Sequence, residues 1–231
     1  MPRKSRFYLP GIPAHIVQRG NNREPVFFAT EDYFAYRDWL TAGATKHGCW
    51  IHAYVLMTNH VHILLTPSTR NSISRLVQFV GRNYVTYVNR VYRRTGTLWE
   101  GRHKGSLVEA DKHLLACYRY IELNPVRAGM VKCPEAYKWS SYGANAWGDD
   151  SWLSPHPEYE RLGPTMDQRY QAYRDLFARH VCNEDLHLIR EAAHYCQPVS
   201  DDRFRLQIEE KYGLRLGQMK RGRPKGVAGE N

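Results

Sequence analysis

The sequence has 231 residues, 42% of them hydrophobic, with six tryptophans and sixteen tyrosines. This composition is sufficient for a folded core and excludes a wholly disordered chain. The net charge of +10 favours an anionic partner, for which nucleic acid and membrane surfaces are the common choices. The longest apolar runs, such as YVLM and HILLT, are far too short to cross a bilayer. The N-terminus lacks the apolar stretch of a signal peptide, and the five cysteines form no C-x-x-C pair, so we expect a cytoplasmic protein with reduced thiols.

The first part of the chain is predicted to alternate between strands and helices. Residues 14–20 form a short strand that ends in the turn-prone sequence GNN. Residues 30–48 form a helix, for which Thr30 is the N-cap candidate. Residues 50–57 and 61–67 are rich in β-branched and aromatic residues, so we expect two adjacent strands joined by a tight turn.

A long amphipathic helix is predicted next, because apolar residues recur every three or four positions over residues 73–91. Residues 104–109 indicate another short strand, and residues 110–129 another helix, with Pro125 near its end. The resulting order, β-α-β-β-α-β-α, is the ferredoxin-like split βαβ pattern. The predicted fold class is therefore α+β, an antiparallel sheet with helices packed on one face.

The composition changes near residues 145–150, where the chain becomes neutral to acidic and rich in proline and glycine. Three amphipathic helices are predicted beyond this point, at residues 169–177, 184–196 and 201–213, and none carries a catalytic grouping. We therefore expect a first domain of residues 1–145, a helical accessory region of residues 146–217 and a basic tail of residues 218–231.

Two histidines interrupt the apolar run MTNHVHILL. Because side chains two positions apart on a strand share a face, His60 and His62 are expected to stand side by side, with Val61 and Ile63 on the other face. Two parallel imidazoles are either a metal site or a pair of polar groups that need other partners. The strand alone does not decide between these two interpretations.

The helix predicted at residues 110–129 supplies two further candidates. Tyr120 and Asn124 are four residues apart and therefore share a helical face, whereas Tyr118 points nearly the opposite way and is expected in the core. An amide oxygen suits a hard cation, and two imidazoles plus one such oxygen leave positions for phosphate and water. A phenol is a poor nucleophile until a metal polarises the phosphate that it attacks. Asn124 also has a structural explanation, because asparagine is common at helix ends and precedes Pro125 here.

The motif NHVH on a strand, followed by a helix that carries YIELNPVRAG, resembles the REP-associated tyrosine transposases. These are relatives of the HUH insertion-sequence transposases, which act on single-stranded DNA. The opening MPRKSRFYLPGIPAHIVQRGNNREPVFF and the segment GTLWEGRHKGSLVE are similar to the same family, so the resemblance covers residues 1–144. An HUH pair alone is a weak signal, and its specificity here comes from YIELNPV at this distance.

The resemblance implies that His60 and His62 hold a divalent cation, Mg²⁺ or Mn²⁺, with Asn124 as the third ligand where related insertion-sequence enzymes carry glutamine. It also implies Tyr120 as the nucleophile, whose attack on a DNA phosphate gives a 5′-phosphotyrosine and a free 3′-OH. No nucleotide cofactor is implied, because the covalent link preserves the bond energy. The implied partner is a single strand with a palindromic hairpin and a guide tetranucleotide, processed at the nucleoid by a monomer or homodimer, with no membrane involved.

Basic residues gather in three places that suit phosphate contact. They lie near the N-terminus, on the outward side of the helix predicted at residues 73–91, and in the tail KRGRPKG. The Arg-Gly-Arg-Pro core of the tail resembles an AT-hook, in which two arginines lie in a narrow A·T-rich minor groove. Ordinary solvated arginines and a disordered basic tail are the alternatives. The candidate DNA-binding residues are Arg19, Arg75, Arg82, Arg90, Arg221 and Arg223.

Two other functions share part of this pattern. A non-catalytic nucleic-acid-binding module on a ferredoxin-like sheet, such as an RRM, would use the histidines structurally, but its K/R-G-F/Y-G/A-F string does not occur here. A rolling-circle replication initiator shares the histidine and tyrosine chemistry but more often brings a helicase domain, for which 231 residues leave no room. The expected function is therefore a metal-dependent transposase that nicks and rejoins single-stranded DNA beside REP-type hairpins.

Overall fold

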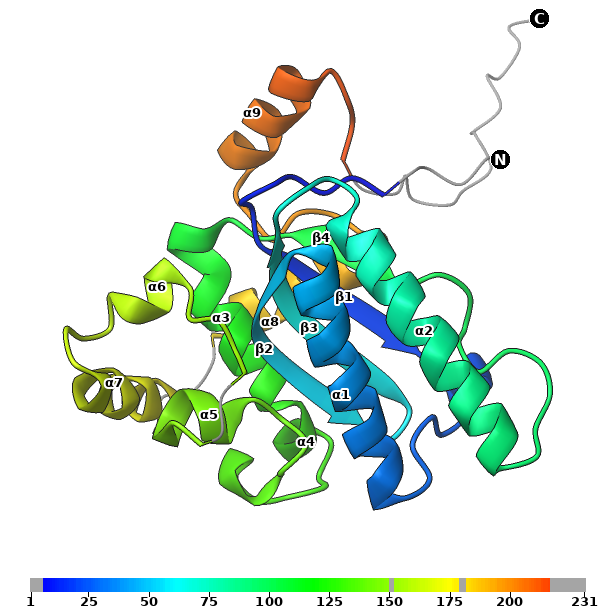
Figure 1. The fold of residues 1–231 in the computed structure, drawn as a ribbon. Coiled ribbons are helices and arrows are strands. Elements are labelled where there is room, and N and C mark those ends of the chain that lie inside the picture. Colours follow the sequence, from blue (N-terminus) through cyan, green and yellow to red (C-terminus); the bar gives the residue numbers. More distant parts are fainter. Residues whose placement is uncertain (1–5, 150–151, 179–181, 217–231) are drawn as a thin grey trace, which may run out of the picture.

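The computed structural model describes residues 6–149, 152–178 and 182–216. Within these ranges the centre of the molecule is a four-stranded antiparallel sheet in the order β2-β3-β1-β4 (Figure 1). This is the strand order of a ferredoxin-like fold, in which the connection from β1 to β2 crosses over and β3 lies between these two strands. The predicted fold class is confirmed. The strands are β1 (Ala14–Arg19), β2 (Cys49–Met57), β3 (His60–Pro67) and β4 (Lys104–Leu107).

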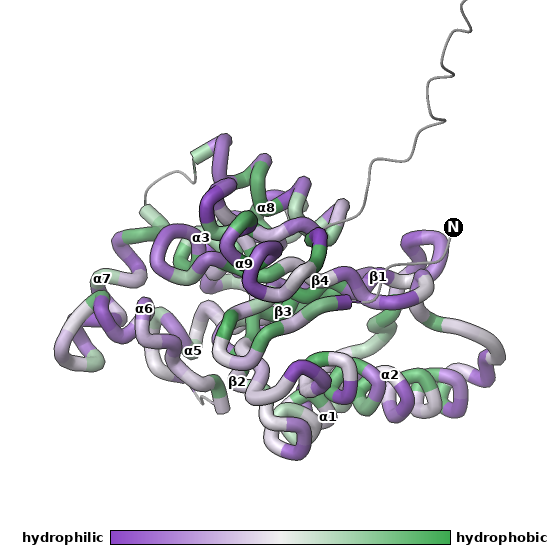
Figure 2. The backbone as a smooth tube through the Cα atoms, turned by 90° about the horizontal axis from the view of Figure 1, so that it is seen from above, coloured by the Kyte–Doolittle hydropathy of each residue, from purple (hydrophilic) through white to green (hydrophobic). Residues whose placement is uncertain are grey.

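Two long helices, α1 (Thr30–His47) and α2 (Ser72–Val91), cover one face of the sheet (Figure 2). Their apolar residues form one core with alternate residues of β3, among them Val61 and Ile63. The predicted period of three to four residues in α2 is confirmed, since its buried positions are Ile73, Leu76, Val80, Tyr84 and Val88.

The expectation of helices on one face only was wrong: the opposite face is covered as well, by α3 (Ala110–Glu122) and α8 (Asn183–Tyr195), because both faces of β2 and β3 are apolar (Figure 2). Leu64 and Val55 contribute to the core on this side, together with Leu114 of α3. Helices on both faces explain why β2 and β3 are buried almost throughout, which a strand covered on one side would not be. His60, His62 and Leu64 alternate with the residues of the first core, so they share the face that α3 covers.

The N-terminus of α1 differs from the prediction by one residue. Ala29 is the N-cap and Thr30 is the first helical residue. The reason is Asp32, whose Oδ2 accepts hydrogen bonds from the backbone N–H groups of Phe28 (2.7 Å) and Ala29 (2.9 Å). The Asp32 carboxylate therefore binds two backbone N–H groups at the start of α1, and the hydroxyl of Thr30 is not needed as a cap.

The helix predicted at residues 110–129 is interrupted. It divides into α3 and the short α4 (Asn124–Arg127), and Leu123, between them, has φ −86° and ψ 0°. Pro125 has no N–H to continue the hydrogen-bond ladder of α3, and it occupies one of the first positions of α4 instead. The elbow between α3 and α4 redirects the chain immediately after Tyr120.

The chain after α4 runs along the outer edge of β2. Leu56 N donates to Trp139 O at 2.8 Å, and Ser154 N donates to Ile51 O at 2.8 Å. Between these two contacts the chain forms a short helix at residues 142–147. The additional short elements of the described residues are η1 (Asn21–Arg23), η2 (Pro134–Ala136), α5 (Tyr142–Trp147) and α6 (Pro157–Glu160).

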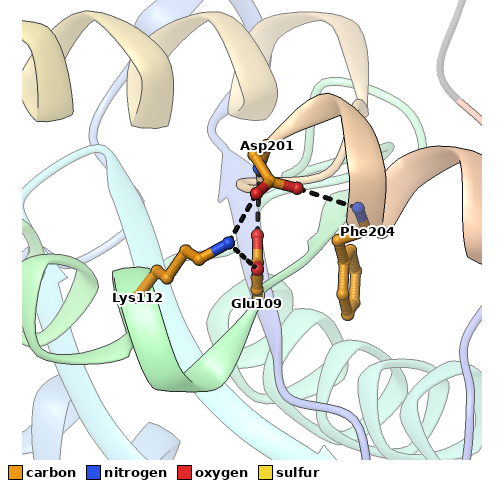
Figure 3. A network of polar contacts seen from close by, with 4 residues as sticks. All are labelled: Glu109, Lys112, Asp201 and Phe204. Atoms are coloured by element: carbon orange, nitrogen blue, oxygen red, sulfur yellow. Dashed lines mark hydrogen bonds and ion pairs between the residues drawn. The ribbon is translucent and has the colours of Figure 1, made fainter.

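The three helices predicted after residue 150 are present as α7 (Met166–Ala178), α8 and α9 (Asp202–Tyr212). A polar network ties α9 to the start of α3 (Figure 3): Lys112 Nζ contacts Glu109 Oε1 at 2.8 Å and Asp201 Oδ2 at 2.5 Å. Asp201 also caps α9 by accepting from Phe204 N at 2.8 Å. Tyr173 and Ile189 belong to the same core as Leu64, so residues from both sides of the predicted boundary pack together. The division into a domain of residues 1–145 and an accessory region of residues 146–217 stays a prediction.

None of the helices within the described ranges is long and apolar enough to span a membrane. The basic tail of residues 218–231, with Arg221 and Arg223, lies outside the described residues.

Candidate active site

The two histidines of β3 stand next to each other, as the strand pattern predicts. The ring centroids of His60 and His62 are 5.1 Å apart, and the ring planes are inclined by 76°. His60 Nδ1 donates to Asn59 Oδ1 at 2.6 Å, because an amide oxygen only accepts. His62 Nδ1 lies 2.8 Å from a nitrogen of a third histidine, His15. Each Nδ1 is thus held by a neighbouring side chain, which directs the Nε2 atom of each ring to other partners.

His15 lies on β1 and is fully buried beneath the histidine pair. Its position follows from the register of β1 with β3, which sets His15 opposite Leu64 and Val17 opposite His62. His15 and His62 are therefore diagonal neighbours on one face. Their rings are nearly parallel, with centroids 5.1 Å apart and 17° between the planes. The sequence pattern of residues 14–20 predicts only a strand and does not single out this histidine.

Tyr120 of α3 faces this histidine cluster. Its ring centroid lies 5.8 Å from that of His62 and 5.8 Å from that of His15, in edge-on geometry. The side chain is 7% exposed, so the phenol sits between helix and sheet rather than in open water. Tyr118, two residues earlier, packs against Tyr159 and Tyr173 in the core. The predicted opposite orientations of Tyr118 and Tyr120 are thus found in the structure.

The elbow between α3 and α4 brings two polar side chains to Tyr120. Asn124 Nδ2 donates to Tyr120 O at 3.1 Å, which leaves its Oδ1 for another partner. Arg127 Nη2 donates to the same carbonyl at 2.5 Å, and Arg127 Cζ lies 4.4 Å from the centroid of the Tyr120 ring. Arg127 was not among the predicted site residues, although it belongs to the NPVRAG motif.

The imidazoles of the cluster are held in their neutral form. Burial lowers the pKa of His15 to about 4. Burial, and then the positive charge of Arg19, lower the pKa of His60 to about 4. The pKa of His62 is well below its usual value because of burial first, and then because of neighbouring histidines and the charges of Arg127 and Arg19. Neutral imidazole is the form that binds a metal ion.

The donor set fits a divalent cation of the Mg²⁺ or Mn²⁺ kind. Two neutral imidazoles with Nδ1 held and Nε2 directed elsewhere are arranged as metal-binding histidines usually are. Asn124 Oδ1 would add a hard oxygen ligand, as expected for such an ion. Within the described residues, no group of three or more histidine, cysteine and acidic side chains is placed to hold a metal.

The predicted DNA-binding arginines do not all join the site. Arg19 pairs with His60 across the β1–β3 ladder and lies close enough to lower its pKa. Arg75, Arg82 and Arg90 are exposed on α2, on the face of the sheet opposite Tyr120. Arg221 and Arg223 lie outside the described residues. DNA contact by these residues stays a prediction.

A buried carboxylate anchors the back of α3. Glu122 is fully buried and accepts hydrogen bonds from Ser141 Oγ (2.5 Å), Asn145 Nδ2 (2.8 Å) and Tyr173 OH (2.7 Å). Burial raises the pKa of Glu122 to about 7, against the opposing effect of these three donors. Because Glu122 points away from the histidines, it fixes the rotation of α3 and takes no part in the cluster itself.

The fold and the site together define an α+β domain in which a helical tyrosine faces a pair of strand histidines. Residues 9–124 match the family described as IS200-like transposases. Since this match spans half of the chain, the protein belongs to that family of DNA transposases.

A solved structure supports the fold. A REP-associated tyrosine transposase, solved with a REP hairpin bound, aligns with a TM-score of 0.55 and 19% identity over 68% of this chain and 92% of that chain. A candidate transposase from Deinococcus radiodurans R1 aligns with a TM-score of 0.37 and 22% identity over 51% of this chain and 95% of that chain. No curated protein matches the chain.

Proposed function

We propose that this transposase cleaves and rejoins single-stranded DNA beside REP-type hairpins through a 5′-phosphotyrosine intermediate and requires a divalent metal ion. The observation that carries the proposal is the position of Tyr120, whose ring lies 5.8 Å from that of His62. A phenol beside two neutral imidazoles brings a nucleophile and a potential metal site to the same phosphate.

The protein's own residues have separate roles in this reaction. Tyr120 Oη forms a bond to phosphorus while the bond to the 3′ oxygen breaks; the phenolic proton leaves Tyr120, and the 3′ oxygen departs as a hydroxyl. His60, His62 and Asn124 hold the cation, whose positive charge, once it is bound, stabilises the negative charge that develops on the phosphate. Strand transfer is the same reaction in reverse at a new 3′ end, so no nucleotide cofactor is required.

The proposed substrate is single-stranded DNA with a hairpin. The REP-associated tyrosine transposase that shares this fold was solved with a REP hairpin bound, and the present chain has a net charge of +10. The exposed arginines Arg75, Arg82 and Arg90 on α2 provide a second basic surface for backbone phosphates of such a structured strand. The protein would meet this substrate at the nucleoid in the cytoplasm.

Covalent adduct formation tests the proposal. The native protein is incubated with end-labelled single-stranded hairpin DNA from the repeats that flank its own gene, with Mg²⁺, Mn²⁺ or EDTA. We expect a denaturation-resistant protein–DNA adduct that needs metal and is absent in Tyr120→Phe and His60→Ala. Tyr118→Phe is the matched control, because Tyr118 lies in the core on the other side of α3, and it should retain the adduct.

The opposite result has an equally clear meaning. If the hairpin binds but no metal yields an adduct or a cleaved strand, then the nuclease chemistry is wrong. The protein would then be a nucleic-acid-binding module in which His60 and His62 are structural.

A further inference from the structure

Arg127 has an unusual combination of contacts beside Tyr120. Its Nη2 is bound to Tyr120 O at 2.5 Å, and its Cζ lies 4.4 Å from the Tyr120 ring centroid. Its Nη1, by contrast, is buried without a hydrogen-bond partner among the described residues. An unsatisfied guanidinium N–H donor is costly inside a protein, so a partner is expected in the working state.

The charge of Arg127 is also uncompensated. No ion pair joins it to a carboxylate within the described part of the chain. Burial, and then the guanidinium of Arg190 on α8, lower the pKa of Arg127 to about 10, opposed by the Tyr120 phenol. Arg127 therefore remains charged at neutral pH. A buried guanidinium that keeps its charge and has no ion pair favours an anion beside it.

The same positive field extends to the histidines. Arg127 and Arg19 both contribute to the low pKa of His62. Arg127 comes from the elbow after α3, and Arg190 is an exposed residue of α8, in the helical region that follows residue 146. Two parts of the chain that are far apart in sequence therefore bring positive charge to the Tyr120 side of the sheet.

We propose that Arg127 forms a phosphate-binding subsite beside Tyr120, which orients the DNA backbone at the reacting tyrosine. This inference rests on the proposed function and deepens it. A guanidinium presents a planar fork of donors that matches phosphate oxygens, so Nη1 of Arg127 is available to a phosphate while Nη2 stays on Tyr120 O.

A purely structural role for Arg127 makes a different prediction. If Arg127 only binds the last carbonyls of α3, its loss lowers stability but leaves the number of DNA phosphates in contact unchanged. Salt dependence separates the two roles, because each phosphate contact with a single strand contributes ~0.7 to the slope of log Kd against log salt.

The experiment uses the full chain with Tyr120→Phe, which keeps the ring under Arg127 and cannot form an adduct. Binding of the single-stranded hairpin DNA is measured by fluorescence anisotropy in EDTA over a series of KCl concentrations. Arg127→Ala is expected to weaken binding roughly tenfold and to lower the salt slope by ~0.7. Arg127→Lys should keep the slope, because the charge remains.

Arg169→Ala is the matched control, since Arg169 is a half-buried arginine of α7 that already contacts Glu160 at 3.9 Å. Its affinity and slope should equal those of the parent. A lowered melting temperature of Arg127→Ala with unchanged affinity and slope would overturn the subsite.

Adduct formation by the native protein, measured in parallel with Mn²⁺, separates this inference from the proposed function. If the native protein forms the adduct and the slopes do not change, then the subsite is wrong and the nuclease chemistry stands. If the slopes change but no adduct forms with any metal, then the subsite is right and the proposed chemistry is wrong.

Discussion

His15 Nε2 lies 2.8 Å from His62 Nδ1 in the buried layer between β1 and β3. A metal on His62 Nε2 requires the proton of that ring to be on Nδ1, and His15 Nε2 is placed to accept it. We therefore predict that His15→Ala weakens Mn²⁺ binding roughly 10- to 100-fold. Titration of free Mn²⁺ by electron paramagnetic resonance measures this directly, without any need for activity.

His52→Ala is the matched control for the His15 prediction. His52 is also a buried histidine, but its ring nitrogens contact Ser154 O (2.7 Å) and Thr66 Oγ1 (2.8 Å). It should lose stability and keep its Mn²⁺ affinity. Equal Mn²⁺ affinity in His15→Ala and His52→Ala would mean that His15 only fills the core.

The amide of Asn124 is predicted to bind the metal through Oδ1, since its Nδ2 is bound to Tyr120 O. Asn124→Ala should weaken Mn²⁺ binding by at least about tenfold, whereas Asn124→Asp should retain it, because a carboxylate also supplies a hard oxygen. Calorimetric titration with Mn²⁺ distinguishes the two variants. If Asn124→Ala binds Mn²⁺ as tightly as the native protein, then Asn124 serves only the α3–α4 elbow.

The arginines of α2 are predicted to bind the DNA backbone without taking part in the chemistry. Arg75, Arg82 and Arg90 are exposed on the face opposite Tyr120. Replacing all three by alanine should lower the salt slope by ~2, about 0.7 for each lost phosphate contact. The rate of adduct formation at saturating DNA should stay that of the native protein. An unchanged slope would show that these arginines are simply solvated.

The buried Glu122 predicts a specific pH dependence of stability. Its pKa in the folded state is raised to about 7 from an ordinary 4.5, so the folded state binds the proton more tightly than the unfolded state does. The free energy of unfolding therefore receives a contribution that is complete below the unfolded-state pKa and is lost as the pH rises through about 7. The full loss is on the order of 3 kcal/mol.

Urea unfolding of the native protein and Glu122→Gln, each at about pH 5 and about pH 8, isolates this contribution. Other groups also change their protonation on unfolding in this pH range, among them His52, whose pKa in the folded state is lowered to about 4 by burial. These groups are present in both proteins. The native protein should lose more stability than Glu122→Gln between the two pH values. The same loss in both would mean that Glu122 is ionised throughout.

The predictable part of the site depended on local periodicity. The i, i+2 spacing of His60 and His62 requires only one strand, which the structure has. Tyr120 and Asn124 were assigned to one helix but lie in α3 and α4; Asn124 Nδ2 nevertheless reaches Tyr120 O at 3.1 Å. The sequence did not predict the elbow between α3 and α4, because the effect of Pro125 depends on the residue at which α3 ends. Without the resemblance of its motifs to a known family, the sequence would not have indicated that the histidines and the tyrosine belong to one site.

The contacts of His15, Arg127 and Glu122 could not be predicted, because each depends on how distant segments pack. His15 meets His62 only through the register of β1 with β3, which strand patterns do not specify when both faces are buried. Glu122 looks like an ordinary polar position on an amphipathic helix. Its partners, Ser141 and Tyr173, come from the end of the predicted first domain and from the predicted accessory region.

The chain that runs along β2 also limits how two copies of the protein can meet. An open sheet edge is a template to which a second copy can add its own strand. Here Leu56 N and Ile51 O are already bonded to Trp139 O and Ser154 N, and Leu107 O of β4 accepts from Val199 N at 2.8 Å. Extension of the sheet at β2 is therefore blocked by the protein's own backbone.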